Sequence, residues 1–166
     1  WQVREGIHGL IPLGSTGEFL SMSPEERRSV AKCVIDTVAG RVPVLIGAGA
    51  ESTDDVIANV RMAEELGADG TMIIPPFYST PTWDELINHF GRIGDAATRP
   101  VMIYNNPATA NVDLTPPLVA ELSRLPLINY IKESTMDVTR IRDILEMSEG
   151  RMTVFGGIMG FESFVA

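Results

Sequence analysis

The sequence predicts a parallel α/β fold, because short apolar runs alternate with helical segments along the chain. The apolar runs are almost continuous, which is typical of strands that are buried on both faces of a sheet. A segment with a recognisable helix start follows each of the first five runs, and one strand–helix unit occupies about thirty residues. We expect six strands, at residues 9–13, 42–47, 70–75, 100–104, 127–132 and 152–156.

Five helices are expected between these strands, and each begins near a residue that can cap it. Ser23 precedes Pro24 and two glutamates, which gives a capping hydroxyl, a proline at the first helical position and acids in the first turn. A second helix opens at Ser52 or Thr53 and ends at Gly67, because glycine readily takes the left-handed conformation that ends a helix. The other three helices are expected to open at residues 82, 115 and 135–137.

A parallel sheet with helices between its strands is either closed into a barrel or open and doubly wound. A dinucleotide-binding open sheet would carry G-x-G-x-x-G after an early strand, and GAGAES at 47–52 has only the first half of that motif. We therefore favour a (β/α)8 TIM barrel and keep the doubly wound sheet as the alternative. A complete barrel has eight strands and typically about 250 residues. Residues 1–166 are accordingly expected to be an incomplete catalytic barrel domain, about strands 2 to 7, without the first and last strands and the C-terminal helices.

The composition is typical of a soluble globular protein, with 45% hydrophobic residues and a net charge of −9. This charge argues against nucleic acid or an anionic membrane as a partner. No apolar run approaches the roughly 20 residues that a membrane helix needs. The single cysteine, Cys33, excludes an internal disulfide and fits the cytoplasm, and we expect it to be a small buried side chain. His8 and His89 lie far apart, so no metal site is expected.

Polar residues follow several of the expected strands, at the edge where barrels and open α/β sheets carry their chemistry. The first strand leads into GSTGE at 14–18, where glycines and the hydroxyls of Ser15 and Thr16 can hold a carboxylate or a phosphate. A glycine-rich turn that bonds only to itself is the plain alternative. Tyr78 follows the third strand and Tyr104 ends the fourth. A single strand-end tyrosine is usually a packing residue, but two tyrosines and a hydroxyl pair on one rim favour a proton relay.

Lys132 ends the fifth strand, in the run LINYIKEST at 127–135. The plain interpretation is a lysine that reaches solvent or pairs with Glu133. Against it, strand alternation places Ile128, Tyr130 and Lys132 on one side, which in a barrel can be the interior. A lysine amine held out of water loses its proton more readily, and the free amine can attack a ketone and form a Schiff base. We therefore favour the functional interpretation.

With GSTGE, YNNP (104–107) and IKEST (131–135) in this order and spacing, the chain resembles the dihydrodipicolinate synthase / N-acetylneuraminate lyase family over essentially its whole length. The resemblance implies a class I lyase on a (β/α)8 barrel that uses no metal and no organic cofactor. It implies aldol cleavage or condensation with pyruvate or a related 2-oxo acid and an aldehyde. It also implies a homodimer or a homotetramer.

The resemblance assigns roles to four of the strand-end residues. Lys132 would form the Schiff base, and Tyr104 would move protons to and from the intermediate. Ser15 and Thr16 match the hydroxyl pair that binds the carboxylate of the 2-oxo acid, and a hydroxyl there also belongs to the proton relay.

Two further residues match family positions, and three neighbouring ones do not suggest catalysis. Tyr78 matches a tyrosine that, in synthase members, reaches into the relay of the neighbouring subunit. Gly156 matches a glycine near the pyruvyl group. Glu18, Asn105 and Asn106 are instead expected to be structural hydrogen-bonding residues.

Two departures from the family pattern bear on the second substrate. Synthases of the family carry an arginine five residues after the strand-end tyrosine, where this chain has Thr109, so a second carboxylate would lose a bidentate partner. Sialic acid lyases follow the seventh strand with acidic residues, where this chain has Ile158 and Met159. Three interpretations stay open: aldol chemistry, dehydration of a 2-keto-3-deoxy sugar acid on the same scaffold, and binding of a 2-oxo acid without catalysis.

Overall fold

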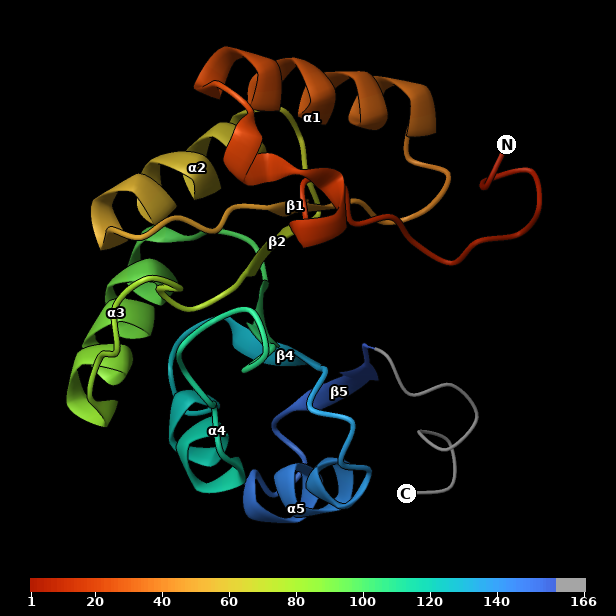
Figure 1. The fold of residues 1–166 in the computed structure, drawn as a ribbon. Helices are drawn as coiled ribbons and strands as arrows, with labels where there is room; N and C mark the ends of the chain where they lie inside the picture. Colours follow the sequence, from red (N-terminus) through yellow and green to blue (C-terminus); the bar gives the residue numbers. More distant parts are fainter. Residues whose placement is uncertain (158–166) are drawn as a thin grey trace.

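The computed structural model describes residues 1–157, whose centre is a five-stranded parallel sheet (Figure 1). The strands follow one another in the sheet in chain order, β1-β2-β3-β4-β5. A doubly wound sheet reverses its strand order at a switch point, whereas a (β/α)8 barrel does not. The described residues therefore form a segment of a (β/α)8 barrel. The strands are β1 (Leu45–Gly47), β2 (Gly70–Ile73), β3 (Val101–Asn105), β4 (Ile128–Glu133) and β5 (Thr153–Gly156).

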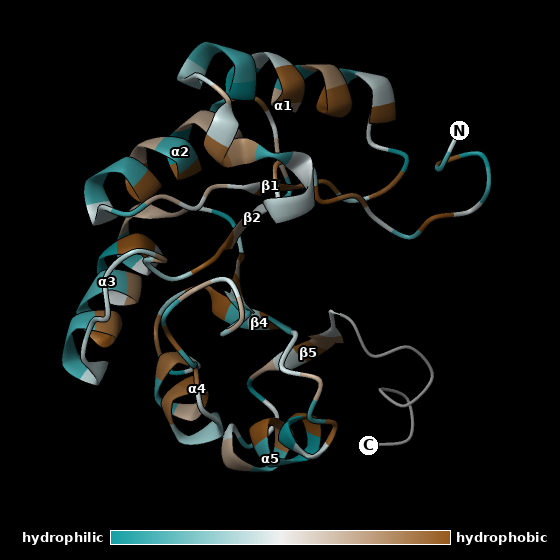
Figure 2. Ribbon diagram, viewed as in Figure 1, coloured by the Kyte–Doolittle hydropathy of each residue, from teal (hydrophilic) through white to brown (hydrophobic). Residues whose placement is uncertain are grey.

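Five helices lie in an arc around the strands (Figure 1). Figure 2 shows hydrophobic and hydrophilic residues side by side along the helices, as expected for helices that cover a sheet with one face and meet solvent with the other. The helices are α1 (Pro24–Val38), α2 (Thr53–Glu65), α3 (Trp83–Ala96), α4 (Pro116–Leu122) and α5 (Thr139–Met147), and two short 3-10 turns, η1 (Ser15–Gly17) and η2 (Phe19–Ser21), precede α1.

The predicted caps of the first three helices are confirmed. At the start of α1, the hydroxyl of Ser23 accepts the N–H of Glu26, and the Glu26 carboxylate accepts the N–H of Ser23. Thr82 and Glu85 make the same reciprocal pair at the start of α3. Ser52 caps α2 through its hydroxyl. Each cap satisfies backbone N–H groups that a first helical turn leaves without partners.

Two helix starts differ from this pattern. Thr115 precedes α4 without a side-chain cap, and Pro116 at the first helical position sets the start instead. The fifth helix begins at Thr139 rather than at 135–137, because Asp137 accepts the N–H and the hydroxyl of Thr139 and holds the preceding residues in a turn. Gly67 follows α2 with a φ of 90°, as predicted for its C-terminal end.

The predicted strand at residues 9–13 is wrong as a regular strand. It is reduced to a single parallel bridge between Leu10 and Val44, supported by bonds from Leu45 N–H to Leu10 and from Gly47 N–H to Pro12. Pro12 has no N–H to continue the ladder, and Leu13 turns the chain with a φ of 62°. The segment nevertheless lies along β1 and leads its following turn toward the end of that strand.

A bulge in β4 changes which residues share a face of the sheet. Val101 of β3 pairs with Ile128, but the next residue, Met102, pairs with Tyr130. Asn129 is therefore an extra residue in β4. An extra residue reverses the alternation of side chains on one side of the bulge relative to the other.

Because of this bulge, the expectation that Ile128 lies on the same side as Tyr130 and Lys132 is wrong. Ile128 packs with Ile131 in the core between the sheet and helices α2 to α5. Tyr130 belongs instead to a second core on the other face, which also contains Tyr104. Lys132 follows Tyr130 by two residues beyond the bulge, so it lies on the Tyr104 side.

The side chain of the single cysteine lies on the outer surface of the protein. Cys33 is exposed on α1, so its predicted burial is wrong. Within residues 1–157, the helices are too short or too polar for any of them to traverse a lipid bilayer.

His89 on α3 is buried with an exposed fraction of 6%, and its Nδ1 lies 2.8 Å from the hydroxyl oxygen of Thr53. Burial lowers the pKa of His89 from 6.5 to about 4, and the positive charge of Arg92 acts in the same direction. The ring is therefore neutral in the folded chain near pH 7.

We predict that His89 makes the folded chain less stable as the pH falls from about 6.5 to about 4. Over that range the unfolded chain binds a proton at His89 and the folded chain does not, which removes about 3 kcal/mol from the free energy of unfolding. Above pH 6.5 the contribution is constant. Urea denaturation of wild type and His89→Gln at several pH values measures it, and the variant should lose less stability over this range. Equal losses in the two proteins would contradict the prediction.

Candidate functional site

The C-terminal ends of β3 and β4 bring Tyr104 and Lys132 together. The two residues are partners in the parallel register, and the Lys132 amino nitrogen lies 4.2 Å from the centroid of the Tyr104 ring. Tyr104 is 6% exposed, whereas Lys132 is half-buried. An amine that faces a buried phenol at the edge of a parallel sheet is placed where barrel enzymes carry their chemistry.

Lys132 does not pair with its neighbour Glu133. Adjacent residues of a strand point to opposite faces, and Glu133 turns away from the lysine to bond with Asn105 and with the N–H of Thr135. The ion pairs found among residues 1–157 do not include Lys132. The plain interpretation of Lys132 as half of a Lys–Glu pair is therefore wrong.

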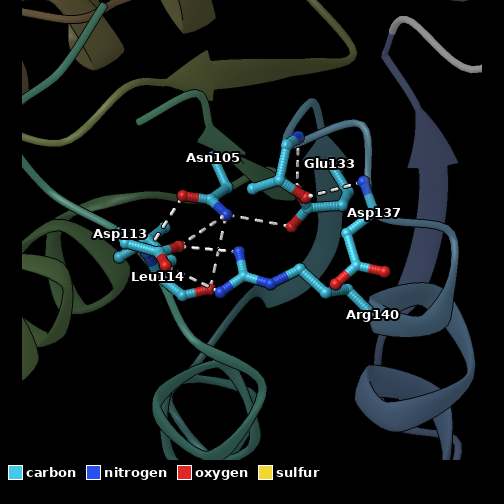
Figure 3. A network of polar contacts seen from close by, with 7 residues as sticks. Asn105, Asp113, Leu114, Glu133, Asp137 and Arg140 are labelled. Carbon is cyan, nitrogen blue, oxygen red and sulfur yellow. Dashed lines mark hydrogen bonds and ion pairs between the residues drawn. The ribbon is translucent and has the colours of Figure 1, made fainter. Parts of the chain in front are cut away.

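A set of polar contacts with a buried inner end, which we call the strand-end clamp, joins the ends of β3 and β4 (Figure 3). The amide nitrogen of Asn105 donates to Glu133 Oε2 at 2.9 Å, and the Asn105 amide oxygen accepts the N–H of Leu114 at 2.9 Å. Asn105 and Glu133 are both fully buried. Since buried polar groups without partners are costly, these bonds fix the relative position of the two strand ends. The clamp consists of Asn105, Asp113, Leu114, Glu133 and Arg140.

The outer end of the clamp is an ion pair between α5 and the loop before α4. Arg140 donates two bonds of 2.7 Å to the carboxylate of Asp113, which also lies 3.3 Å from the Asn105 amide nitrogen. Partial burial alone would raise the pKa of Asp113, but the hydrogen bonds from Arg140 and Asn105 hold it below its ordinary value. The carboxylate is therefore charged near neutral pH and keeps its bidentate partner.

Gly157 lies against Lys132, and the sequence analysis did not single it out. A Cβ added to Gly157 would collide with the hydroxyl oxygen of Ser134 and come within 3.0 Å of Lys132 Cε. Gly156, the glycine assigned by resemblance, is the exposed last residue of β5 and pairs in register with Glu133. The doubled glycine at the end of β5 was the available signal, because glycine at a strand end often marks a close approach.

Ser15 reaches the same region from the turn η1. It lines a small hollow with Tyr104 and Gly47, at the ends of β3 and β1. Only glycine fits at position 47, because an added Cβ would collide with the backbone of Leu13 just before the turn. Thr16 follows Ser15 in η1 and is exposed. Ser15 is also exposed, but it lines the hollow that Tyr104 lines, whereas Thr16 is not part of that lining.

Tyr78 is not brought to the other predicted residues. It is 86% exposed on the loop after β2. Glu51 holds this loop by accepting the N–H groups of Phe77, Tyr78 and Ser79 at 2.9 to 3.1 Å. The slight burial of Glu51 alone would raise its pKa, but these bonds and the Ser79 hydroxyl lower it. The carboxylate therefore fixes a loop that presents Tyr78 outward.

A larger cavity, of about 330 Å³, lies away from Lys132 between the starts of α2 and α3. Its acidic wall residues are Glu51 and Glu85, and their carboxylates bond to the loop at 77–79 and to the cap of α3. It contains neither Lys132 nor Tyr104. We place the candidate site at the strand ends, because reactive groups meet there. Within residues 1–157, no group of three metal-ligating side chains is arranged to hold an ion.

The residues expected to bear on the second substrate are only partly within the structure. Thr109 is exposed, and its hydroxyl donates to the carbonyl of Asn106 at 3.3 Å, so it serves a turn. Ile158 and Met159 lie outside the described residues.

Comparison with known proteins gives a consistent result. The model of the "Dihydrodipicolinate synthetase family" matches residues 1–165. The 4-hydroxy-tetrahydrodipicolinate synthase of Methanosphaerula palustris is 46% identical over 144 residues, which are 87% of this chain and 49% of that protein. The synthase of the same name from Cereibacter sphaeroides is 41% identical over 141 residues, 85% of this chain and 49% of that protein. The chain spans about half the length of the curated relatives it matches.

Solved structures match the described fold closely. The dihydrodipicolinate synthase of Acinetobacter baumannii, solved in complex with pyruvate, superposes with a TM-score of 0.90 at 34% identity, covering 93% of this chain and 53% of that one. YagE, a prophage protein of the dihydrodipicolinic acid synthase family from Escherichia coli K12, also in complex with pyruvate, gives a TM-score of 0.88 at 38% identity over 92% of this chain and 53% of its own.

The clamp generates a prediction for stability. Asn105→Ala should lower the free energy of unfolding by about 3 to 5 kcal/mol, because it leaves a buried carboxylate oxygen and a buried N–H without partners. Asn111→Ala is the matched control: this exposed amide donates to the carbonyls of Phe77 and Tyr78, and its loss should cost no more than about 1 kcal/mol. Urea denaturation measures both. Similar losses in the two variants would show that the clamp is not a principal stabilising contact.

Proposed function

The chain belongs to the dihydrodipicolinate synthetase family, and from this premise we propose that it is the central part of a Schiff-base-forming lyase that acts on pyruvate or a related 2-oxo acid. The observation that carries the proposal is the position of the Lys132 amine over the ring of Tyr104, at the carboxyl ends of β3 and β4. Two structural relatives that were solved with pyruvate support the choice of ligand.

Lys132 is the nucleophile in this proposal. Its free amine attacks the keto carbon of the 2-oxo acid, and loss of water gives a protonated imine. The imine withdraws electrons, so it stabilises the enamine that forms when a neighbouring C–C bond breaks or is made. Tyr104 supplies and removes protons next to the imine without adding a fixed charge. In this proposal, Lys132 supplies the nucleophile for imine formation and Tyr104 supplies the proton transfers.

Ser15 and Thr16 bind the carboxylate of the 2-oxo acid, and Gly157 leaves space beside Lys132. The hollow that Ser15 shares with Tyr104 supports the placement of the carboxylate near the relay. Gly156, which pairs in register with Glu133, is proposed to lie near the pyruvyl group, as the resemblance implies. Holding both the reacting carbon and the carboxylate supplies the orientation on which such reactions depend.

The active assembly is proposed to be larger than one copy of this segment. The chain spans about half of its relatives, so the catalytic domain is completed by the remaining barrel strands and C-terminal helices. The exposed Tyr78 on its fixed loop is suited to reach the relay of a neighbouring subunit in a homodimer or a homotetramer. A cytoplasmic location fits the single cysteine.

Synthases of the family carry an arginine that can bind a carboxylate of the second substrate. Because this chain lacks that arginine, we propose that its second substrate is an aldehyde without such a carboxylate. Thr109 occupies the position of that arginine and bonds to its own turn, so it offers no bidentate partner. Dehydration of a 2-keto-3-deoxy sugar acid passes through the same imine on Lys132 and stays the second candidate function. Assays of pyruvate release and of water loss from such acids would separate the two reactions.

The proposal predicts a covalent adduct at one lysine. The sequence has two lysines, Lys32 and Lys132, and Lys32 is exposed and paired with Asp36. Incubation of the full-length protein with pyruvate and borohydride should add one reduced pyruvyl group, and peptide mapping should locate it on Lys132.

Lys32→Arg is the matched control and should keep the adduct, whereas Lys132→Arg should abolish it. Arginine keeps the charge of each residue but cannot form the imine. An adduct that survives Lys132→Arg, or a folded full-length protein without any adduct, would sink the lyase proposal and favour a binding protein for 2-oxo acids.

A further inference from the structure

Asn106 contacts the reactive hydroxyl of Tyr104 directly. Its amide nitrogen donates to the Tyr104 hydroxyl oxygen at 2.9 Å. The two residues are 8% and 6% exposed, so the bond is shielded from water. Asn105, between them, points to the opposite face and belongs to the strand-end clamp. The two neighbouring asparagines thus have different partners: Asn105 joins β3 to β4, and Asn106 bonds to the phenol of Tyr104.

The backbone of Asn106 is fixed by a tight turn. Its carbonyl accepts the N–H groups of Thr109 and Ala110 at 3.0 and 2.9 Å, and the Thr109 hydroxyl at 3.3 Å. Pro107 follows and restricts the backbone of Asn106 to extended conformations. The amide is therefore presented to the phenol from a constrained backbone, which is the property of a group that positions another.

The direction of this hydrogen bond has a chemical consequence. A phenol oxygen donates one hydrogen bond and accepts others. Because the Asn106 amide donates, it occupies an acceptor site of the Tyr104 oxygen and leaves the hydroxyl proton to point elsewhere. A donor at this oxygen also stabilises negative charge when the proton leaves, as in an oxyanion hole.

We propose that Asn106 is a positioning residue that aims the Tyr104 proton at the substrate on Lys132 and stabilises the phenolate that forms. The inference rests on the proposed function. In the first step Tyr104 gives its proton to the hydroxyl of the carbinolamine, the C–O bond breaks, and water, the iminium ion and the phenolate result. In the second step a C–H bond next to the iminium carbon breaks. Its electron pair becomes the C=C bond of the enamine, the C=N electrons return to nitrogen, and the phenolate takes the proton.

Exchange of the methyl protons of pyruvate in deuterated water tests this inference without the second substrate. NMR follows the exchange on the full-length protein, and borohydride trapping measures the imine on Lys132 in parallel. Asn106→Asp keeps the shape of the side chain but replaces the donor by an acceptor that binds the phenol proton and repels the phenolate. Asn106→Leu removes the bond without adding charge.

We expect the amount of pyruvate trapped at saturation, after imine formation has reached equilibrium, to stay within about twofold of wild type in both variants, because Asn106 acts on the rates of proton transfer. The exchange rate should fall at least about tenfold in Asn106→Asp and less in Asn106→Leu. A purely structural role predicts the opposite order, because aspartate fits the asparagine site better than leucine does. Asn59→Asp is the matched control: this amide on α2 donates to the carbonyl of Ala48, just after β1, and the variant should exchange protons at the wild-type rate.

The outcomes separate this inference from the proposed function. Wild-type protein that traps no pyruvate on Lys132 overturns both. Wild-type trapping combined with unchanged exchange in Asn106→Asp overturns the role of Asn106 alone. The same holds if exchange in the Asn106 variants falls only in proportion to trapped pyruvate, or if Asn106→Leu is the slower variant.

Discussion

The hydrogen bond between Asn105 and Glu133 is the contact on which the candidate site depends. It joins β3 to β4 at their last residues, inside the protein and away from water. The register that it holds places Tyr104 opposite Lys132. Glu133 has its second oxygen bonded to the N–H of Thr135, so the carboxylate is satisfied without using the adjacent lysine. Among the described residues, the amine of Lys132 therefore faces Tyr104 without an ion pair to its acidic neighbour.

The clamp and the candidate site lie on opposite faces of the sheet at the ends of β3 and β4. Asn105 and Glu133 point to the helix side, where Asp113 and Arg140 extend the bonding outward. Tyr104 and Lys132 point to the other side. This division follows from strand alternation, because adjacent residues cannot share a face. One more or one fewer residue in β4 before the site would turn Lys132 to the helix side and Glu133 to the other side. The bulge at Asn129 gives the register in which Lys132 lies beside Tyr104.

The sequence was sufficient for the features that local chemistry decides. The capping boxes at Ser23 and Thr82 each depend on only four consecutive residues, so the sequence reveals them directly. The nearly continuous apolar runs likewise indicate buried parallel strands. Lys132 and Tyr104 could be placed at adjacent strand ends, because consecutive strands of a barrel are neighbours. The expectation that Asn105 is a structural hydrogen-bonding residue is also confirmed.

Features that depend on tertiary pairing could not be predicted. The bulge at Asn129 exists only relative to β3, so alternation counted along β4 alone put Ile128 on the wrong side. The doubled glycine at 156–157 indicates a close approach, but it does not identify the partners of Gly157, which are Lys132 on β4 and Ser134 just after it. The partner of Glu133 is 28 positions away in the chain, and a helix-like run around Cys33 does not say which face is outward.

The most direct test of the clamp's role compares two variants that are destabilised by similar amounts. Asn105→Ala removes the clamp, and Ile93→Ala removes buried side-chain volume on α3, away from the strand ends, at a cost of about 2 to 5 kcal/mol. Under conditions in which both proteins are folded, the rate of pyruvate trapping on Lys132 should fall at least about tenfold further in Asn105→Ala, because small displacements of reacting groups are costly. Equal trapping rates in the two variants would show that the position of Lys132 does not depend on the clamp.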